Sequence, residues 1–451
     1  MDRQFLCGAA KADITPNEAL IHDLYGLMMI PYAGVIDHLH LRVLAFSDGL
    51  HRALVVAFDL DKAPNPAEWL PLLQERTGIP TENITYIGTH THSAPLTTVR
   101  PREDRGRSPS KQQMKARLQY ESFLQMTLLS TVDEALSGMV PARIGYGKGS
   151  SFINVNRNEE YCCATDSGET IKYVSQGLNF NREVDHTVHV VEMQTLEGQP
   201  IAFLVNYAMH CDVMFRNRYH EDGSMGISGD VAGTVSRCIE TRIPGCVAVW
   251  SSGAAGDVNP IITNEMFYAD PVHGRNTIEL MKNYETLEQI MHSLAFRHLD
   301  DVMRVINSIR EFSCSVMIQG AVEWSQTPGV EVIRTQDGQW KVGKENEDGY
   351  RIRLHLLRIG PIALFGIGGE LYNSFGCQIQ RQSPLTATLI LNHDASLIED
   401  AGYIMDDDTL DRIDSKRTVH GLVPGGRTPM VKGYVGNSLR QHTHSMFEKV
   451  M

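Results

Sequence analysis

Two histidines separated by one residue, His90 and His92, follow a strand-like run in the stretch Ile87–Pro95, which reads IGTHTHSAP. In a β-strand, side chains at positions i and i+2 point to the same side. Both imidazoles are therefore predicted to face one atom, such as a metal ion or a polarised substrate oxygen. The alternative is a surface loop with hydrogen-bonded histidines, and partners elsewhere in the chain decide between the two.

Four further stretches share one feature with IGTHTHSAP: each is an apolar strand that runs into a short polar, Gly- or Pro-containing loop. They are VNYAMHCDVM with His210, MGISGDVAG with Ser228 and Asp230, WSSGAAGDVNP with Asp257, and LFGIGGELYNSFG with Glu370. Rigid scaffolds carry their functional residues on such loops. Imidazoles and a carboxylate are also the ligand types of a catalytic zinc ion, which keeps one position open for water.

Each of these residues also has a structural interpretation. Glu370 is predicted at a helix start, where a carboxylate interacts favourably with the helix dipole. Asp230 precedes a helical pattern and can cap it. His210 follows an apolar strand and can be a hydrogen-bonded core histidine.

Six motifs together resemble the N-terminal catalytic domain of the neutral ceramidase family. In chain order they are GAAKADITP, THTHSAP, AMHCD, ISGDVAG, GAAGDVNP and GGEL. The match extends from about Gly8 to Tyr403, and THTHSAP, ISGD and AGDVNP are its most specific parts. The resemblance implies a zinc-dependent hydrolase that cleaves a C–N amide bond.

The resemblance also implies a set of site residues. The residues that match the family's zinc ligands are His90, His210, Glu370 and, in GYIMDD, Tyr403. Tyr372 is a competitor for the tyrosine position, but it lies within the presumed helix. His92 matches a histidine that contacts the scissile group, and Arg157 in INVNRN resembles an arginine that contacts the substrate.

These roles are consistent with the chemistry of hydrolysis. Zinc lowers the pKa of bound water from about 15.7 to about 7. The oxyanion formed by attack on a carbonyl is stabilised by zinc, Tyr403 or His92; alternatively, His92 protonates the leaving amine. Asp59 and Asp230 are predicted to hydrogen-bond the histidines. A serine nucleophile would have Ser252 as its nearest candidate, but no GxSxG motif surrounds it, so metal-activated water is favoured.

Composition limits the class of protein. The chain has 451 residues, of which 42% are apolar and 21% charged, as in globular proteins with a large core. Its net charge of −13 and the absence of a long basic run argue against nucleic acid and anionic membranes as partners. No apolar run reaches the roughly 18 residues of a membrane span.

The eight cysteines include no CxxC pair, which favours reduced thiols in a cytoplasmic protein. The N-terminus lacks the apolar region of a secretory signal, which favours the same location. Cys162 and Cys163 are predicted to lie in a mobile loop as incidental thiols, with a reactive or metal-binding pair as the alternative.

Strand-like and helix-like segments alternate along the chain and are also joined by short turns. Strands are predicted over Leu41–Ser47, Ala53–Asp59, His186–Met193, Pro200–Ala208, Cys246–Ser252, Arg351–Ile359, Pro361–Ile367 and Thr386–Asn392. Helices are predicted over Pro64–Arg76, Lys115–Ser137, Asp230–Thr241 and Thr277–Glu311. The prediction is an α/β fold in which mixed β-sheets are flanked by helices.

We expect residues 1–451 to form a single catalytic domain, because no strong linker divides the chain. Pro101–Gln113 is a polar insertion, predicted to be a flexible loop beside THTHSAP, and Glu323–Tyr350 is a second polar, Gly-containing segment.

The expected substrate is a small soluble N-acyl compound rather than ceramide. Ceramidases of the family are secreted or membrane-associated and carry a C-terminal sandwich domain, and neither feature is visible in this sequence. Arg157 is a natural clamp for a carboxylate or a hydroxyl-rich group. The basic residues after THTHSAP, which either add to that clamp or simply solvate a loop, are Arg100, Arg102 and Arg105. Two alternatives stay open: a zinc hydrolase of ester or glycosidic bonds, and a non-catalytic binding protein. The sequence does not specify an oligomeric state.

Overall fold

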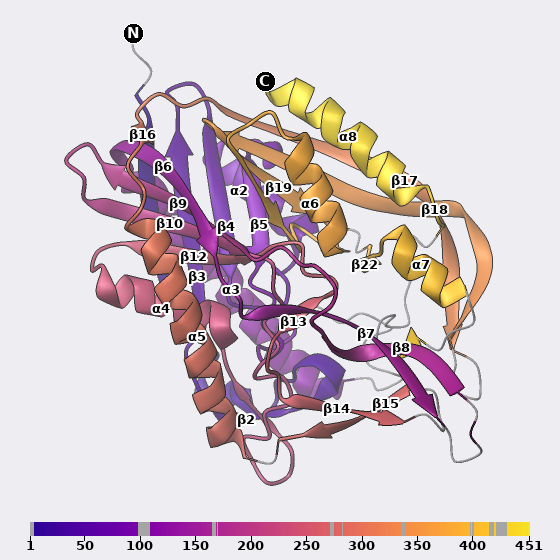
Figure 1. The fold of residues 1–451 in the computed structure, drawn as a ribbon. Helices are drawn as coiled ribbons and strands as arrows, with labels where there is room; N and C mark the ends of the chain where they lie inside the picture. Colours follow the sequence, from indigo (N-terminus) through magenta and orange to yellow (C-terminus); the bar gives the residue numbers. More distant parts are fainter. Residues whose placement is uncertain are drawn as a thin grey trace.

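The computed structural model describes most of the chain. The described residues are 4–97, 109–164, 168, 170–270, 275–281, 283–334, 340–396, 398, 401–414, 419–420 and 431–451. Within them, helices lie on the outer faces of two sheets that pack against each other (Figure 1).

The larger sheet has nine strands, in the order β12-β10-β9-β6-β1-β3-β4-β5, with β16 paired to β6. The strands are β1 (Leu6–Asp13), β3 (His40–Ser47), β4 (Arg52–Phe58), β5 (Ile84–Gly88), β6 (Val140–Ser150), β9 (Thr187–Thr195), β10 (Pro200–Tyr207), β12 (Val247–Ser252) and β16 (Phe312–Ser313). Parallel pairs (β4 with β5, β10 with β12) and antiparallel pairs occur together. The sheet is therefore mixed.

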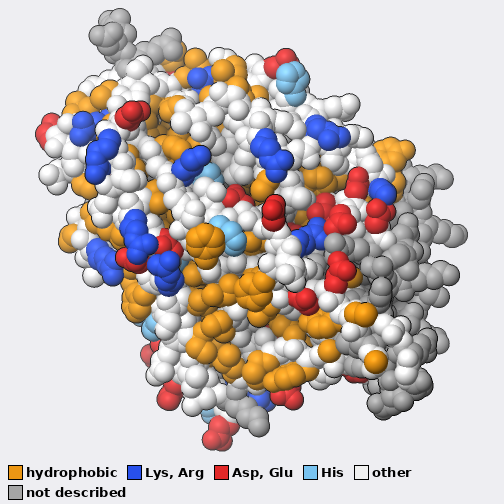
Figure 2. Space-filling model, viewed as in Figure 1, with side chains coloured by type: hydrophobic (Ala, Val, Ile, Leu, Met, Phe, Trp, Pro, Cys, Tyr) orange, Lys and Arg blue, Asp and Glu red, His pale blue; other side chains and the backbone are white. Residues whose placement is uncertain are grey.

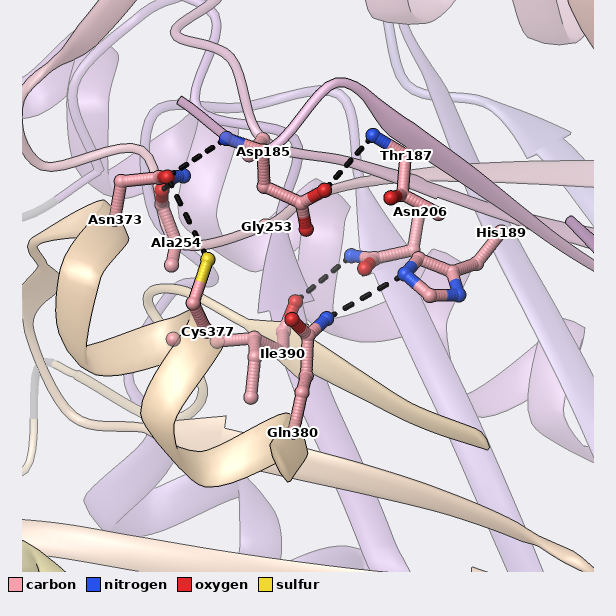
Figure 3. Close-up of a pocket in the computed structure, with 12 residues that line it drawn as sticks. Asp185, Thr187, His189, Asn206, Gly253, Ala254, Asn373, Cys377, Gln380 and Ile390 are labelled. Atoms are coloured by element: carbon pink, nitrogen blue, oxygen red, sulfur yellow. Dashed lines mark hydrogen bonds between the residues drawn. The ribbon is translucent and has the colours of Figure 1, made fainter. Parts of the chain in front are cut away.

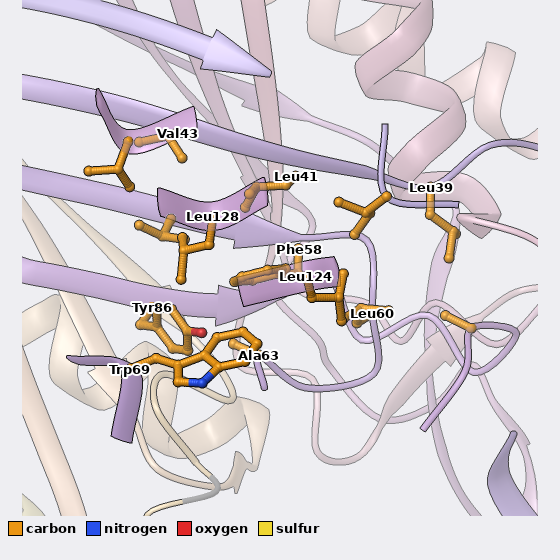
Figure 4. Close-up of a cluster of buried hydrophobic side chains, with 14 of the residues drawn as sticks. Leu39, Leu41, Val43, Phe58, Leu60, Ala63, Trp69, Tyr86, Leu124 and Leu128 are labelled. Atoms are coloured by element: carbon orange, nitrogen blue, oxygen red, sulfur yellow. The ribbon is translucent and has the colours of Figure 1, made fainter. Parts of the chain in front are cut away.

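Four helices cover the outer face of this sheet. They are α2 (Pro66–Thr77), α3 (Lys111–Ser137), α4 (Asp230–Arg242) and α5 (Tyr284–Ile306). Alternate residues of β3, such as Leu41 and Val43, pack against Leu124 and Leu128 of α3 (Figure 4). A second cluster joins β10 and β12 to α4 and α5. This cover makes the sheet a rigid support for the loops at its strand ends.

The smaller sheet has four strands, in the order β17-β18-β19-β21. The strands are β17 (Ile318–Arg334), β18 (Trp340–Ile359), β19 (Ile362–Ile367) and β21 (Ala387–Leu391). One face packs Leu357 and Leu389 against Leu44 and Phe46 of β3, so the two sheets share a core. The other face is covered by α6 (Asn373–Gln382) and α8 (Val435–Val450), and α8 lies along β17 and β18 in Figure 1.

The remaining elements are short or lie at one end of the molecule. Paired strands are β2 (Tyr32–Val35) with β11 (Met225–Ile227), β14 (Glu265–Asp270) with β15 (Arg275–Leu280), and β20 (Glu370–Leu371) with β22 (Tyr403–Ile404). A further group comprises β7 (Asn154–Ala164), β8 (Thr170–Asn179), β13 (Val258–Pro260) and β23 (Val419–His420). Two short helices are α1 (Glu18–Ile21) and α7 (Asp407–Asp414).

The fold class is confirmed: mixed sheets are flanked by helices. Some boundaries differ from the prediction. The end of the predicted loop Pro101–Gln113 belongs to α3, because Ser110 Oγ accepts the Gln113 N–H (3.1 Å) while Gln113 Oε1 accepts the Ser110 N–H (2.9 Å). This reciprocal capping box starts a helix. Residues 98–108, with Arg100, Arg102 and Arg105, lie outside the described residues.

The helix predicted over Thr277–Glu311 begins only at Tyr284. Asn283 caps it, since its Oδ1 accepts the N–H groups of Glu285 (2.8 Å) and Thr286 (3.2 Å). The residues before the cap pair with β14 as strand β15. An N-cap oxygen fixes where helical hydrogen bonding starts, and here it overrides the apolar periodicity.

Two other segments form strands. Cys162 and Cys163 lie in β7, so the prediction of a loop was wrong for them; β8 pairs with this strand residue by residue. The polar segment Glu323–Tyr350 forms much of the β17–β18 hairpin over its described residues. Cross-strand pairing satisfies the backbone there.

The described surface has mixed charge. On the face in Figure 2, Lys and Arg side chains lie among acidic and neutral ones, and hydrophobic side chains gather in the lower half. Within the described part of the chain, no helix combines the length and apolar content needed to cross a membrane.

Candidate metal centre

Loops that follow strands of both sheets meet at one point. The loop after β5 carries His90 and His92, and the segment after β10 carries His210. An isolated parallel bridge between Thr91 and Cys211 joins these two segments, and the His92 N–H donates to the Cys211 carbonyl at 3.0 Å. The histidine loops are thus fixed to each other by backbone pairing as well as by side chains.

The three imidazoles lie in contact. His92 Nε2 is 3.2 Å from His90 Nε2, and the ring centroids of His90 and His210 are 4.8 Å apart. One ring nitrogen from each of the three histidines lies within 4.8 Å of the other two. His90 and His210 are buried, whereas His92 is partly exposed.

The histidines converge by a different route from the one predicted. Strand β5 ends at Gly88, so His90 and His92 are not on a regular strand. His90 instead adopts a left-handed backbone conformation with φ of 64°. Such a conformation is uncommon for a residue other than glycine, and it persists only where surrounding contacts impose it. The rings meet because the loop turns, not because alternate side chains share one face.

Hydrogen bonds orient the two buried rings. His90 Nδ1 is 2.8 Å from Asp61 Oδ1, and His210 Nδ1 is 3.1 Å from the carbonyl oxygen of Val258. With Nδ1 engaged, each ring presents Nε2 to the cluster, which is the arrangement of metal-binding histidines.

The predicted partners of the histidines, Asp59 and Asp230, were wrong. Asp59 Oδ2 accepts from Arg42 (2.9 Å) and from the His40 N–H (2.9 Å). Asp230 Oδ2 accepts the Met214 N–H at 2.7 Å. The sequence gives no periodic signal for Asp61, because it lies in an irregular loop beyond the end of β4.

Glu370 enters the cluster from the smaller sheet. Its Oε2 lies 3.2 Å from His210 Nε2 and 3.7 Å from His90 Nε2. Glu370 is not at a helix start as predicted; it lies in β20, paired with Tyr403 of β22, and α6 begins three residues later at Asn373. Tyr403 is therefore placed beside Glu370 by backbone pairing. Tyr372, the competing tyrosine, precedes the first residue of α6 and is fully buried.

Arg157 lies at the edge of the cluster. Its Nη2 donates to the Gly256 carbonyl (2.7 Å), and its Nη1 lies 3.5 Å from His210 Nε2. The guanidinium carbon lies 4.9 Å from the centre of the Tyr403 ring. The structure thus brings together all six residues that the sequence singled out: His90, His92, His210, Glu370, Tyr403 and Arg157.

Neighbouring charges shift the pKa values of the two buried rings, His90 and His210, in opposite directions. Burial opposes charge on His90, but Asp61 and Glu370 outweigh this and raise the pKa of His90 to about 10. Burial and the nearby Arg157 lower the pKa of His210 to about 4, so that ring is neutral at pH 7.

His393 is a further residue of the cluster that sequence reasoning missed. It follows β21, and its ring stacks on that of His90 with centroids 3.9 Å apart. Ligand atoms of His90, Glu370 and His393 lie within 4.8 Å of one another, and this is a second group able to hold a metal ion. The sequence pattern that could have identified His393 is ILNHDAS, in which an apolar strand runs into a polar loop as in the other motif loops.

Polar contacts fix the start of α6 next to Glu370. Asn373 accepts the Asp185 N–H (2.8 Å) and donates through Nδ2 to the Ala254 carbonyl (2.9 Å), beside a small polar cavity (Figure 3). The Asn373 N–H donates to Asp257 Oδ1 at 2.8 Å, and the Asp257 carbonyl accepts the Arg157 N–H. Asp257 of the GAAGDVNP motif therefore connects the start of α6 to Arg157.

The side chain of Ser252, the candidate serine nucleophile, forms a hydrogen bond to the backbone. Its side chain is buried, and its Oγ donates to the Met209 carbonyl at 3.0 Å. This hydrogen bond occupies the hydroxyl proton with a backbone acceptor.

The fold is similar to that of solved ceramidases. A crystal structure of the neutral ceramidase from Pseudomonas aeruginosa superimposes with a TM-score of 0.69 at 14% identity, covering 99% of this chain and 74% of the other. A ceramidase complexed with C2 superimposes with the same TM-score and identity, covering 100% of this chain and 75% of that one. No protein-family model and no curated protein sequence matches the chain. The chain therefore has a neutral ceramidase-like fold, with a cluster of histidines and a carboxylate that can hold a metal ion.

Proposed function

We propose that this protein is a zinc-dependent hydrolase that cleaves the C–N amide bond of a small soluble N-acyl compound. The observation that supports it most directly is the convergence of His90, His210 and Glu370 from three separate strand ends onto one buried point. The ceramidase-like fold adds support for amide chemistry, because ceramidases act on an amide.

The donor atoms fit zinc. Imidazole nitrogens and a carboxylate oxygen are its usual protein ligands, and catalytic sites leave one position open. We assign His90, His210, Glu370 and Tyr403 as the residues that hold the ion. When bound, a zinc ion polarises a carbonyl and lowers the pKa of water to about 7.

The remaining residues serve the reaction of water with the amide. The water oxygen adds to the carbonyl carbon, the C–N bond breaks, and the products are a carboxylic acid and an amine. His92 is suited to deliver the proton to the departing nitrogen, because its ring is partly exposed and its Nε2 lies 3.2 Å from His90 Nε2. Tyr403 is suited to stabilise the developing oxyanion, because the pairing of β20 with β22 places it beside Glu370 and its ring centre lies 4.9 Å from the Arg157 guanidinium carbon.

Replacing His92 by alanine is expected to separate catalysis from metal binding. Zinc content should stay near that of the wild type, because His90, His210 and Glu370 remain. Turnover should fall by roughly a hundredfold or more, the contribution of one acid–base group. Elemental analysis and steady-state kinetics on the same preparation measure both quantities. Loss of zinc from this variant would make His92 a ligand and contradict the assigned role.

The substrate is expected to be polar near the scissile bond. The Arg157 guanidinium is buried beside Tyr403, and its Nε has no hydrogen-bond partner among the described residues. A guanidinium at the edge of the cluster suits a carboxylate or a hydroxyl-rich group on the substrate.

We therefore expect soluble N-acyl amino acids and N-acyl amino sugars to be cleaved with a higher kcat/KM than ceramide in detergent micelles. The assay uses zinc-loaded enzyme, with chelator-treated enzyme and the His92→Ala variant as controls. A kcat/KM for ceramide above that of every soluble amide would overturn the substrate proposal while leaving the hydrolase proposal in place. Ester and glycoside substrates in the same screen test the alternative bond types. Failure to take up zinc would favour a non-catalytic binding protein.

A further inference from the structure

The imidazole of His393 is buried without a hydrogen-bond partner among the described residues. Its side chain is 0% exposed, and neither ring nitrogen has a partner among the described residues. A neutral imidazole carries one donor and one acceptor, and leaving both unpaired in the interior is unfavourable. Buried polar groups are nearly always satisfied, so this one calls for a specific explanation.

The position of His393 is imposed by its neighbours. The next residue, Asp394, accepts the Tyr86 N–H (2.8 Å) and hydrogen bonds from Arg353 (2.9 Å) and His355 (2.6 Å). Gly366 leaves room for this carboxylate, since a Cβ there would lie 2.3 Å from Asp394 Oδ2. His393 itself has a left-handed φ of 62°. An unfavourable backbone and a buried ring held this firmly indicate a functional constraint rather than simple packing.

The His393 ring lies against two residues of the candidate metal centre. It stacks on His90 with an angle of 27° between the planes, and one of its nitrogens lies within 4.8 Å of ligand atoms of His90 and Glu370. Its environment includes Glu370 and Asp61, which offset part of the positive charge of an ion.

We infer that His393 is an additional ligand of the metal ion that His90 and Glu370 hold. The inference rests on the proposed metal site and adds a residue that the family resemblance did not indicate. A bound ion would satisfy a ring nitrogen that has no protein partner. The competing explanation is that His393 only supports the His90 ring by stacking.

A second buried histidine provides a matched control. His298 is also 0% exposed, but its two nitrogens are engaged by Ser151 Oγ (3.0 Å) and by the Trp250 N–H (3.2 Å). It lies on α5, outside the candidate metal centre. Replacing either histidine by leucine removes a buried imidazole, but only His393→Leu removes an unpartnered one.

The first test compares zinc affinity and metal-free stability in the two variants. His393→Leu is expected to weaken zinc binding at least about tenfold, the minimum effect of losing even an outer-shell partner. Its metal-free melting temperature should equal or exceed that of the wild type, because no hydrogen bond is lost. His298→Leu should show the reverse: wild-type zinc affinity and a lower melting temperature. Competition with a chromophoric chelator and thermal unfolding after chelation give the two readouts. Wild-type zinc affinity in His393→Leu would overturn the inference.

A second variant distinguishes direct ligation from stacking support. His393→Cys, loaded with cobalt(II), is expected to gain a near-ultraviolet thiolate-to-cobalt charge-transfer band that the wild type and His298→Cys lack. A stacking role predicts no such band, and its absence in a folded, cobalt-loaded variant would contradict ligation. If the wild type binds neither metal, the proposed function itself fails, which is a different outcome from loss of the His393 effect alone.

Discussion

Replacement of His90 by alanine is expected to leave the purified protein without stoichiometric zinc and without measurable hydrolysis. His90 belongs to both groups of potential ligands, the one with His92 and His210 and the one with Glu370 and His393. Its removal also takes away the partner of Asp61. Zinc affinity should fall by more than the roughly 10- to 100-fold that follows loss of an outer-shell partner.

Metal content by elemental analysis and kcat/KM on a soluble N-acyl substrate check this expectation together. Ser252→Ala is the control, since the Ser252 hydroxyl is hydrogen-bonded to the backbone carbonyl of Met209. It should keep both zinc and activity. If His90→Ala were active and Ser252→Ala inactive, the result would contradict metal-assisted hydrolysis and indicate a serine nucleophile.

The substitution Asp394→Asn is expected to cause the largest loss of stability among the variants considered. Burial would raise the pKa of Asp394, but His355 and Arg353 lower it to about 2, so the carboxylate is ionised at neutral pH. Both partners are also buried, at 0% and 3% exposure. Removing the negative charge leaves the Arg353 guanidinium buried without compensation, which costs about 3–5 kcal/mol.

Chemical denaturation of wild type and variant measures the difference in the free energy of unfolding. Asp133→Asn is the matched control, because Asp133 pairs with Arg76 at the surface, where both side chains are nearly half exposed. An exposed pair contributes about 0–1 kcal/mol. Equal losses in the two variants would mean that the Asp394 cluster is solvated in solution and does not form the rigid support inferred for the loop after β21.

Local sequence patterns were enough to predict most of the regular elements. The apolar runs of β3 and β4 and the periodicity of α4 each depend on neighbours within a few positions, so their bounds agree with the structure to within about two residues. The motif loops could also be predicted locally, because a strand that ends in polar and glycine residues can be recognised without knowing which segments it contacts. The observed starts of α3 and α5 differ from the predicted ones, because a single side-chain oxygen at the N-cap decides where helical hydrogen bonding starts.

The sequence by itself determined which residues have metal-binding chemistry, and the tertiary structure decided which of them meet and how. Asp61 rather than Asp59 orients His90, because the chain turns out of the sheet after β4, so strand alternation no longer governs where these side chains point. Tyr403 reaches Glu370 through the pairing of β20 with β22, a contact between segments that are distant in the chain. His393 joins the cluster because two sheets pack face to face and bring the ends of β5 and β21 together. A local pattern contains no information about such distant contacts, because their geometry is set by how the sheets pack.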